Sequence, residues 1–164
     1  MKPSSPVLIA GFSAMAMAGV VAAAPVAGPD PEVIATIRAV IEAGQKGDIA
    51  SLGRLYAPDC TFVDEFAPFL WTGPGSVSAY FSSGARMYQQ TQHKDDRITA
   101  GRPAFVYVSD DKAFVVEPLG GTAKVGGKPY ASRGAYAFSL SRIDGRWMIT
   151  SQTWTKASES RNPY

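Results

Sequence analysis

The chain has 164 residues, which is the length of one domain, and its 46% hydrophobic and 18% charged residues exclude a disordered or fibrous protein. The formal net charge is only +2, and the sequence shows no basic stripe of the kind that binds nucleic acid. One cysteine and one histidine exclude a disulfide framework, a zinc finger and a metal cage built from several histidines. We therefore expect no metal, no cofactor and no nucleic-acid partner.

The first residues have the pattern of an export signal. Lys2 is the only charge before Ala27, and residues 7–24 are all apolar or small. A short basic start, an apolar middle and a small-residue end predict a secretory signal peptide over residues 1–23, cleaved after Ala23. Cleavage after Ala27 and a retained membrane anchor are the alternatives, although a run of about 18 residues barely spans a bilayer. We expect a periplasmic or secreted protein without a stable membrane anchor.

Three helices are predicted in the first half of the domain, because residues that favour helix N-caps stand before apolar residues at helical spacing. In the first of these helices Val33, Ile37 and Val40 fall on one side. The predicted helices run from Asp30 to Gly47, from Asp48 to Pro58 and from Ser76 to Gln92, each capped by its first residue.

Strand patterns fill the rest of the domain, and Asp144-Gly145 is a strong hairpin signal between the last two. Helices followed by an antiparallel meander predict an α+β domain over residues 30–156, with a strongly bent sheet that wraps around a long helix and leaves a cone with an opening. Residues 157–164 are expected to form a flexible tail. The strands are predicted over 60–66, 97–100, 104–108, 112–119, 121–125, 130–143 and 146–156.

Four segments carry a resemblance to a known family. They are IRAVIEAGQKGD (37–48), LYAPDCTFVDEF (55–66), WTGPGSVSAY (71–80) and IDGRWMITSQTWT (143–155). Together with the order of elements they resemble the nuclear transport factor 2-like superfamily, and within it the SnoaL-like and ketosteroid-isomerase-like group. The resemblance implies the cone-shaped fold and a homodimer formed through the sheet. It implies no single chemistry, since this superfamily includes isomerases, cyclases, dehydratases, epoxide hydrolases and non-catalytic binding domains.

The candidate catalytic residues are Asp64, His93 and Tyr136. Asp64 resembles the proton-shuttling aspartate of ketosteroid isomerases, and a partly apolar pocket would raise its pKa enough for that task. The alternative is a structural hydrogen bond from Asp64 to the loop that follows it. The isomerases also need donors for a developing oxyanion, but Val40 stands at the matching helix position, which leaves Tyr136 as a substitute. The polar neighbours of His93 favour the surface, unless it faces the opening and pairs with Asp64.

A cluster of aromatic residues surrounds Asp64 in the sequence and suggests an apolar pocket. Arg133 is placed either in the pocket or on the solvated face of its strand, and the same alternatives hold for Glu117. The residues predicted to line the pocket are Phe62, Phe66, Phe69, Trp71, Tyr88, Arg133 and Trp154.

Two functions fit these observations. The first is an exported domain that binds a small hydrophobic or aromatic molecule and performs acid–base chemistry of the isomerase or cyclase kind without a cofactor. The second is a non-catalytic dimeric module that binds a ligand or a protein, which the missing oxyanion donors favour.

Overall fold

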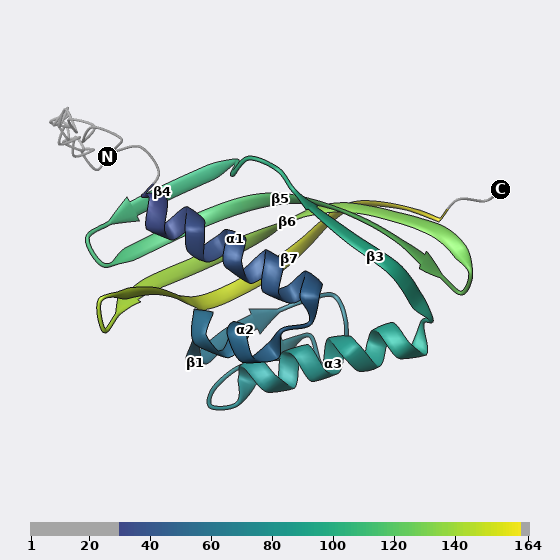
Figure 1. Ribbon diagram of the computed structural model, residues 1–164, viewed down its shortest axis with the longest axis horizontal. Helices are drawn as coiled ribbons and strands as arrows, with labels where there is room; N and C mark the ends of the chain where they lie inside the picture. Colours follow the sequence, from purple (N-terminus) through teal and green to yellow (C-terminus); the bar gives the residue numbers. More distant parts are fainter. Residues whose placement is uncertain (1–29, 162–164) are drawn as a thin grey trace, which may run out of the picture.

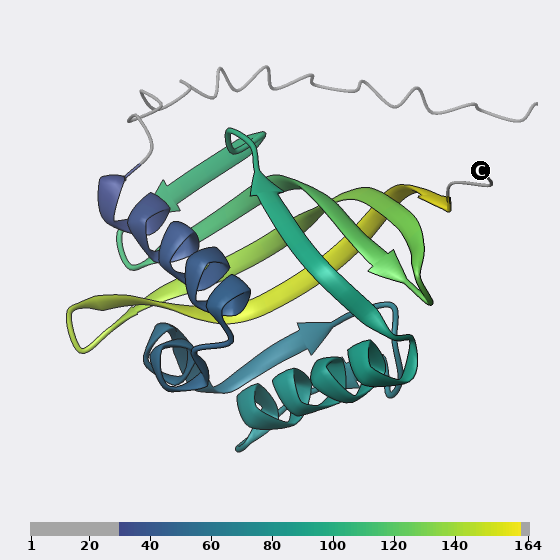
Figure 2. The same ribbon diagram turned by 45° about the vertical axis from the view of Figure 1, so that its right-hand side comes forward.

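Three helices lie on one face of a curved seven-stranded sheet (Figure 1 and Figure 2). The computed structural model describes residues 30–161, so the predicted signal peptide lies outside the described residues. Within that range no helix is long and apolar enough to cross a membrane. The helices are α1 (Pro31–Lys46), α2 (Ile49–Leu55) and α3 (Ser76–Gln90).

The sheet has the order β2-β1-β7-β6-β5-β3, and β4 adds to β5 at one end. All neighbours are antiparallel except β1 and β7, which run parallel. The α+β fold is therefore as predicted, but the sheet is mixed, because β1 pairs in parallel with the last strand, β7, as well as antiparallel with β2. The strands are β1 (Tyr56–Val63), β2 (Leu70–Trp71), β3 (His93–Ala100), β4 (Phe105–Ser109), β5 (Lys112–Val125), β6 (Lys128–Ile143) and β7 (Arg146–Arg161).

Several predicted ends of helices and strands are wrong, and the pairing of the strands explains each difference. Pro58 lies inside β1 instead of ending α2, at an irregular part of the β1–β7 register where no ladder hydrogen bond is required of it. The Gly120-Gly121 pair does not interrupt β5, because β3 and β6 pair with the strand on both sides there. Residues 157–161 extend β7 along the start of β6, with Arg161 opposite Tyr130, so these five residues are not a flexible tail.

The helix caps were predicted correctly at two of three positions. Asp30 accepts from the backbone N–H of Glu32, and Asp48 accepts from that of Ser51. At α3 the cap is Gly75, which adopts a left-handed φ of 84° without strain. The Ser76 hydroxyl instead donates to the carbonyl of Cys60 at 2.5 Å, which ties α3 to β1.

The core lies between the helices and the concave face of the sheet. The predicted apolar side of α1 is buried there, with Val33, Ile37 and Val40 packed against strand residues. Each such side chain contributes about 1.5–3 kcal/mol on burial. Residues from the sheet that complete the core include Val115, Phe138, Leu140 and Ile149.

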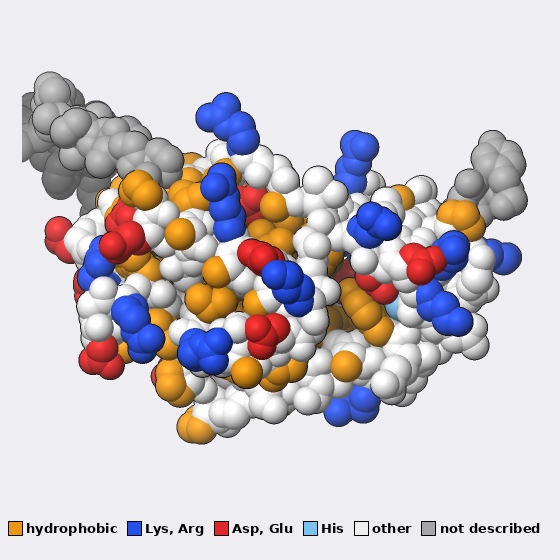
Figure 3. Space-filling view, viewed as in Figure 1, with side chains coloured by type: hydrophobic (Ala, Val, Ile, Leu, Met, Phe, Trp, Pro, Cys, Tyr) orange, Lys and Arg blue, Asp and Glu red, His pale blue; other side chains and the backbone are white. Residues whose placement is uncertain are grey.

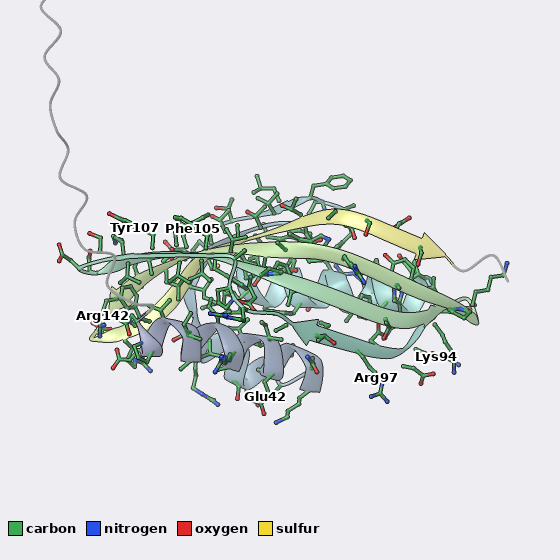
Figure 4. All side chains as sticks on the ribbon, turned by 90° about the horizontal axis from the view of Figure 1, so that it is seen from above. Glu42, Lys94, Arg97, Phe105, Tyr107 and Arg142 are labelled. Atoms are coloured by element: carbon green, nitrogen blue, oxygen red, sulfur yellow. The ribbon has the colours of Figure 1, made fainter. Side chains whose placement is uncertain are left out.

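The convex face of the sheet carries exposed aromatic side chains near one end. Phe105 and Tyr107 on β4 point away from α1 (Figure 4), and both are more than half exposed. Tyr107 pairs across the strands with Phe114, which is also exposed and lies 6.2 Å from Phe105 between ring centroids.

Candidate functional site

A cavity of about 550 Å³ opens between α1, α3, β3 and the concave face of β5–β7. This volume is in the range of pockets that hold small molecules. Figure 3 shows a hollow on this face with hydrophobic side chains in its depth and charged side chains around its edge. Its aromatic lining consists of Tyr56, Phe66, Tyr80, Phe81, Tyr88, Tyr130, Tyr136 and Trp154. Its charged or titratable lining, besides the tyrosines, consists of Asp64, Glu65, His93, Asp96, Arg97, Lys156 and Glu159.

Side chains alternate between the two faces of β6, and those on one face form a wall of the cavity. Tyr130, Ser132 and Tyr136 line it, whereas Arg133 is exposed on the other face. This settles which face of the strand is interior, and it shows that Arg133 is not a pocket residue. The reason is the strand period of two, which sends Arg133 away from its neighbour Ser132.

Gly134 allows the ring of Trp154 to lie close against β6. A Cβ at this position would stand 2.5 Å from the Trp154 ring and 2.3 Å from the carbonyl oxygen of Thr155. The register between β6 and β7 also shifts at this point. The absence of a side chain at Gly134 therefore permits the close packing that makes Trp154 a wall of the cavity.

Asp64 stands just after the end of β1, where two donors hold its carboxyl group. One oxygen accepts from the backbone N–H of Glu65 at 2.7 Å, and the other accepts from the Tyr80 hydroxyl at 2.7 Å. Burial raises the pKa of Asp64, while these two hydrogen bonds partly offset the rise. Asp64 is consequently more basic than an ordinary aspartate and keeps a fixed orientation.

A second layer of polar groups lies behind Tyr80. The amide nitrogen of Gln152 donates to the Tyr80 hydroxyl at 3.4 Å, and the Tyr56 hydroxyl donates to the amide oxygen of Gln152. Burial raises the pKa of Tyr56 and of Tyr80 well above ten, so both hydroxyls keep their protons at neutral pH. The ring of Phe62 stacks on that of Tyr80, with the two centroids 4.3 Å apart.

Tyr136 supplies a further hydroxyl on the same side of the cavity. Burial and the nearby charge of Asp64 raise the pKa of Tyr136, so that it too remains a hydrogen-bond donor. Its ring packs at 5.1 Å from that of Trp154. The structure thus brings Asp64 and Tyr136 to one cavity, as the sequence predicted.

His93 also lines the cavity, but it belongs to a separate group of side chains. Its Nδ1 hydrogen bonds with the Thr91 hydroxyl at 2.6 Å, and its ring stacks on Tyr88 at 4.6 Å. Burial raises the pKa of Tyr88 to about 12. No hydrogen bond joins His93 to Asp64 in the described part of the chain, so the two do not form the direct pair that the sequence suggested.

Lys156 ties the segment after Asp64 to β7. Its ammonium group contacts carboxylate oxygens of Glu65 and Glu159, each at 2.7 Å. Burial alone would lower the pKa of Lys156, but the hydrogen bonds to these two acids raise it. The ion pairs fix the loop that carries Glu65, and therefore the backbone N–H that Asp64 uses.

Three more predicted pocket residues lie outside the cavity. Phe62 and Trp71 are buried beneath it, because β1 and β2 pair them with each other and they pack on Tyr80. Phe69 is 59% exposed, because β1 ends at Val63 and the turn that follows sends Phe69 outward. Phe66, Tyr88 and Trp154 do line the cavity, as predicted.

Sequence reasoning missed several residues of the site. Tyr80 belongs to the buried core as well as to the cavity wall, so apolar spacing on α3 does not mark its hydroxyl as part of the site, and no prediction covered Gln152. One signal was available for Gln152, since it is a polar residue two positions before Trp154 and so faces the same side of β7. Glu117 is buried on the concave face outside the cavity; burial raises its pKa, and Arg38 on α1 partly offsets this.

No group of three or more histidine, cysteine, aspartate or glutamate side chains within residues 30–161 could hold a metal ion.

Comparison with known proteins agrees with this arrangement of elements. The family described as a SnoaL-like domain matches residues 33–154. The chain belongs to the SnoaL-like domain family. The match runs from α1 to the middle of β7 and includes Asp64, Tyr80, Tyr136 and Gln152, whereas Lys156 and Glu159 follow its end.

Individual relatives of this SnoaL-like chain are distant. A steroid Delta-isomerase from Nocardioides simplex is 29% identical over 92 residues, which are 54% of this chain and 75% of the relative. A hexachlorocyclohexane dehydrochlorinase, LinA-type3 from Novosphingobium barchaimii, superposes with a TM-score of 0.69 at 13% identity, covering 80% of this chain and 88% of the other. A ketosteroid isomerase-like protein from Erwinia carotovora superposes with a TM-score of 0.62 at 20% identity, covering 77% and 95%. At these identities the structural matches establish the fold alone.

The role of Gly134 is open to a direct test. In Gly134→Ala the new methyl group overlaps Thr155 and Trp154, so we expect a loss of about 1–3 kcal/mol in the free energy of unfolding, measured by urea titration. Gly120→Ala is the matched control, because a Cβ there meets nothing within 4 Å. An equal, small effect of both substitutions would contradict the close-packing explanation.

Proposed function

We propose that this SnoaL-like protein binds a small hydrophobic molecule in the cavity and moves a proton on it without a cofactor, with Asp64 as the base. The observation that carries the proposal is the half-buried Asp64 carboxyl group, oriented by Glu65 and Tyr80 and facing an aromatic cavity. A carboxyl group with a raised pKa can take a proton from carbon and return it, which an ordinary aspartate does poorly.

The reaction that suits this geometry is the isomerisation of an unsaturated ketone. Asp64 removes a proton from the carbon next to the carbonyl group, and the electron pair of the C–H bond moves into an enolate. The Tyr136 hydroxyl, which keeps its proton, donates to the enolate oxygen as negative charge develops there. Protonated Asp64 then returns the proton to another carbon, which restores the ketone with its double bond moved. The named activity of the Nocardioides simplex relative supports this reaction class.

The charges on the cavity wall favour a neutral ligand over an anionic one. Four acidic side chains line the cavity against the two basic ones, Arg97 and Lys156. Lys156 is already paired with Glu65 and Glu159, so it offers little to a ligand carboxylate. A carboxylate ligand would thus lose hydration without gaining a full partner.

The test uses a β,γ-unsaturated ketone, whose conversion to the conjugated isomer is followed by ultraviolet absorption. Asp64→Asn should lower kcat by about 10²–10⁴-fold, because amides do not act as bases at neutral pH. In the unchanged protein kcat/KM should fall as the pH drops through the raised pKa of Asp64, since only the ionised form accepts a proton. Asp59→Asn on the exposed part of β1 is the control. Full activity in Asp64→Asn would rule out Asp64 as the base.

A second function, that of a dimeric binding module, is favoured by the exposed aromatic patch on the convex face. We propose that Phe105, Tyr107 and Phe114 pack against a second copy of the chain, since solvent-exposed aromatic side chains in contact commonly mark interfaces. We also propose, from the pattern of residues 1–23, that the protein is exported.

Sedimentation analysis at micromolar concentration tests the dimer. We expect a dimer for the unchanged protein and a monomer for Tyr107→Glu, because a buried unpaired carboxylate is costly at an interface. The control variant Lys94→Glu should remain dimeric, because Lys94 points away from this face in Figure 4. A monomeric unchanged protein, or a dimer that Tyr107→Glu leaves intact, contradicts this interface.

A further inference from the structure

The polar side chains behind Asp64 form a chain of hydrogen bonds with one direction. Tyr56 donates to the amide oxygen of Gln152, the amide nitrogen of Gln152 donates to Tyr80, and Tyr80 donates to Asp64. The three residues behind Asp64 come from β1, β7 and α3, so the chain connects three elements of the fold.

Burial leaves these groups few other partners. Tyr56 is 1% exposed, Gln152 is 4% exposed and Tyr80 is 6% exposed. A buried hydroxyl or amide that makes no hydrogen bond costs free energy, so each must find its partner within the protein. In the described part of the chain, the amide oxygen of Gln152 is the acceptor for the Tyr56 hydroxyl.

The direction of the chain follows from this first bond. Because the Gln152 oxygen faces Tyr56, the nitrogen of the same amide faces Tyr80. The Tyr80 oxygen accepts from that nitrogen, so its own proton must point elsewhere. That proton goes to the carboxylate of Asp64, 2.7 Å away, which is a stronger acceptor than the neutral Tyr136 hydroxyl that also neighbours Tyr80.

We propose that Tyr56 and Gln152 are positioning residues, whose hydrogen bond fixes the amide of Gln152 so that the Tyr80 hydroxyl donates to Asp64. The inference rests on the proposed function, in which Asp64 is the base, but it concerns two cavity-lining residues that make no hydrogen bond to Asp64 itself. Without the Tyr56 hydroxyl, the amide can turn and offer its oxygen to Tyr80. That oxygen would then compete with Asp64 for the Tyr80 proton.

The basicity of Asp64 therefore depends on the Tyr56 hydroxyl, although Gln152 and Tyr80 stand between the two groups. The titratable groups that face Asp64 are Tyr80 and Tyr88 from α3, Tyr136 from β6, Lys156 from β7 and the adjacent Glu65. In the described structure the Tyr56 hydroxyl hydrogen bonds to none of these five groups. Any effect of Tyr56 that passes along this chain must therefore go through Gln152 and Tyr80.

The experiment is an NMR titration of the ¹³C-labelled Asp64 carboxyl group in ligand-free protein, with the signal assigned by its loss in Asp64→Asn. Tyr80→Phe removes the donor and should raise the measured pKa of Asp64 by about one unit. Tyr56→Phe keeps its ring and should raise the pKa by a smaller amount. The double variant should match Tyr80→Phe, because Tyr56 acts only through Tyr80. Tyr107→Phe, exposed on β4, should leave the value unchanged.

Gln152→Asn provides a second variant if Tyr56→Phe does not fold. Its shorter amide cannot span both hydroxyls, and Tyr80 becomes a weaker donor when it no longer accepts a hydrogen bond, so the pKa of Asp64 should again rise. An unchanged pKa in Tyr56→Phe or Gln152→Asn, or a Tyr56→Phe shift that adds fully to that of Tyr80→Phe, overturns the inference. The titration involves no turnover, so an active Asp64→Asn would refute the proposed function while leaving this result to be judged separately.

Discussion

A carboxyl group held halfway between water and an apolar core is the constraint around which this cavity is arranged. Fully buried, Asp64 would stay protonated at neutral pH; fully exposed, it would be too weak a base for proton transfer from carbon. Two hydrogen bonds, from the Glu65 backbone and the Tyr80 hydroxyl, stabilise its ionised form enough to offset part of the cost of burial. The aromatic walls exclude water from the carboxyl group, and this loss of hydration disfavours its ionised form.

Two contacts between distant segments bring Tyr80 and its neighbour Gln152 to Asp64. The parallel pairing of β1 with β7 places the end of β1, from which Asp64 follows, beside Gln152. The hydroxyl of Ser76 ties α3 to β1, and Tyr80 follows one turn later on that helix. The site therefore depends on contacts between residues far apart in the chain, and it forms only when the helices and the last strand are both in place.

Local patterns in the sequence predicted much of this arrangement. The caps at Asp30 and Asp48 follow from short-range chemistry, and the strand period of two separates the two faces of β6 without saying which is interior. The SnoaL-like fold and the position of Asp64 came from the resemblance. These features share one property: each is determined by residues close together in the chain or by a family pattern.

Other features had no local signal. Phe66 and Phe69 are both aromatic residues after β1, yet the loop turns one into the cavity and the other into solvent, which alternation cannot predict beyond the end of a strand. The Tyr56–Gln152–Tyr80 chain connects residues from three separate elements, so no spacing in the sequence marks it. The parallel β1–β7 pair is non-local in the same sense.

The proposed proton transfer requires that Asp64 have a raised pKa and still ionise. The most direct measurement is the ¹³C-carboxyl titration of Asp64 in the unchanged, ligand-free protein. We expect a midpoint clearly above the value of about 3.9 that an unperturbed aspartate shows. A midpoint at or below that value would mean that Tyr80 and the Glu65 backbone stabilise a purely structural carboxylate, and the proposed proton transfer would be contradicted.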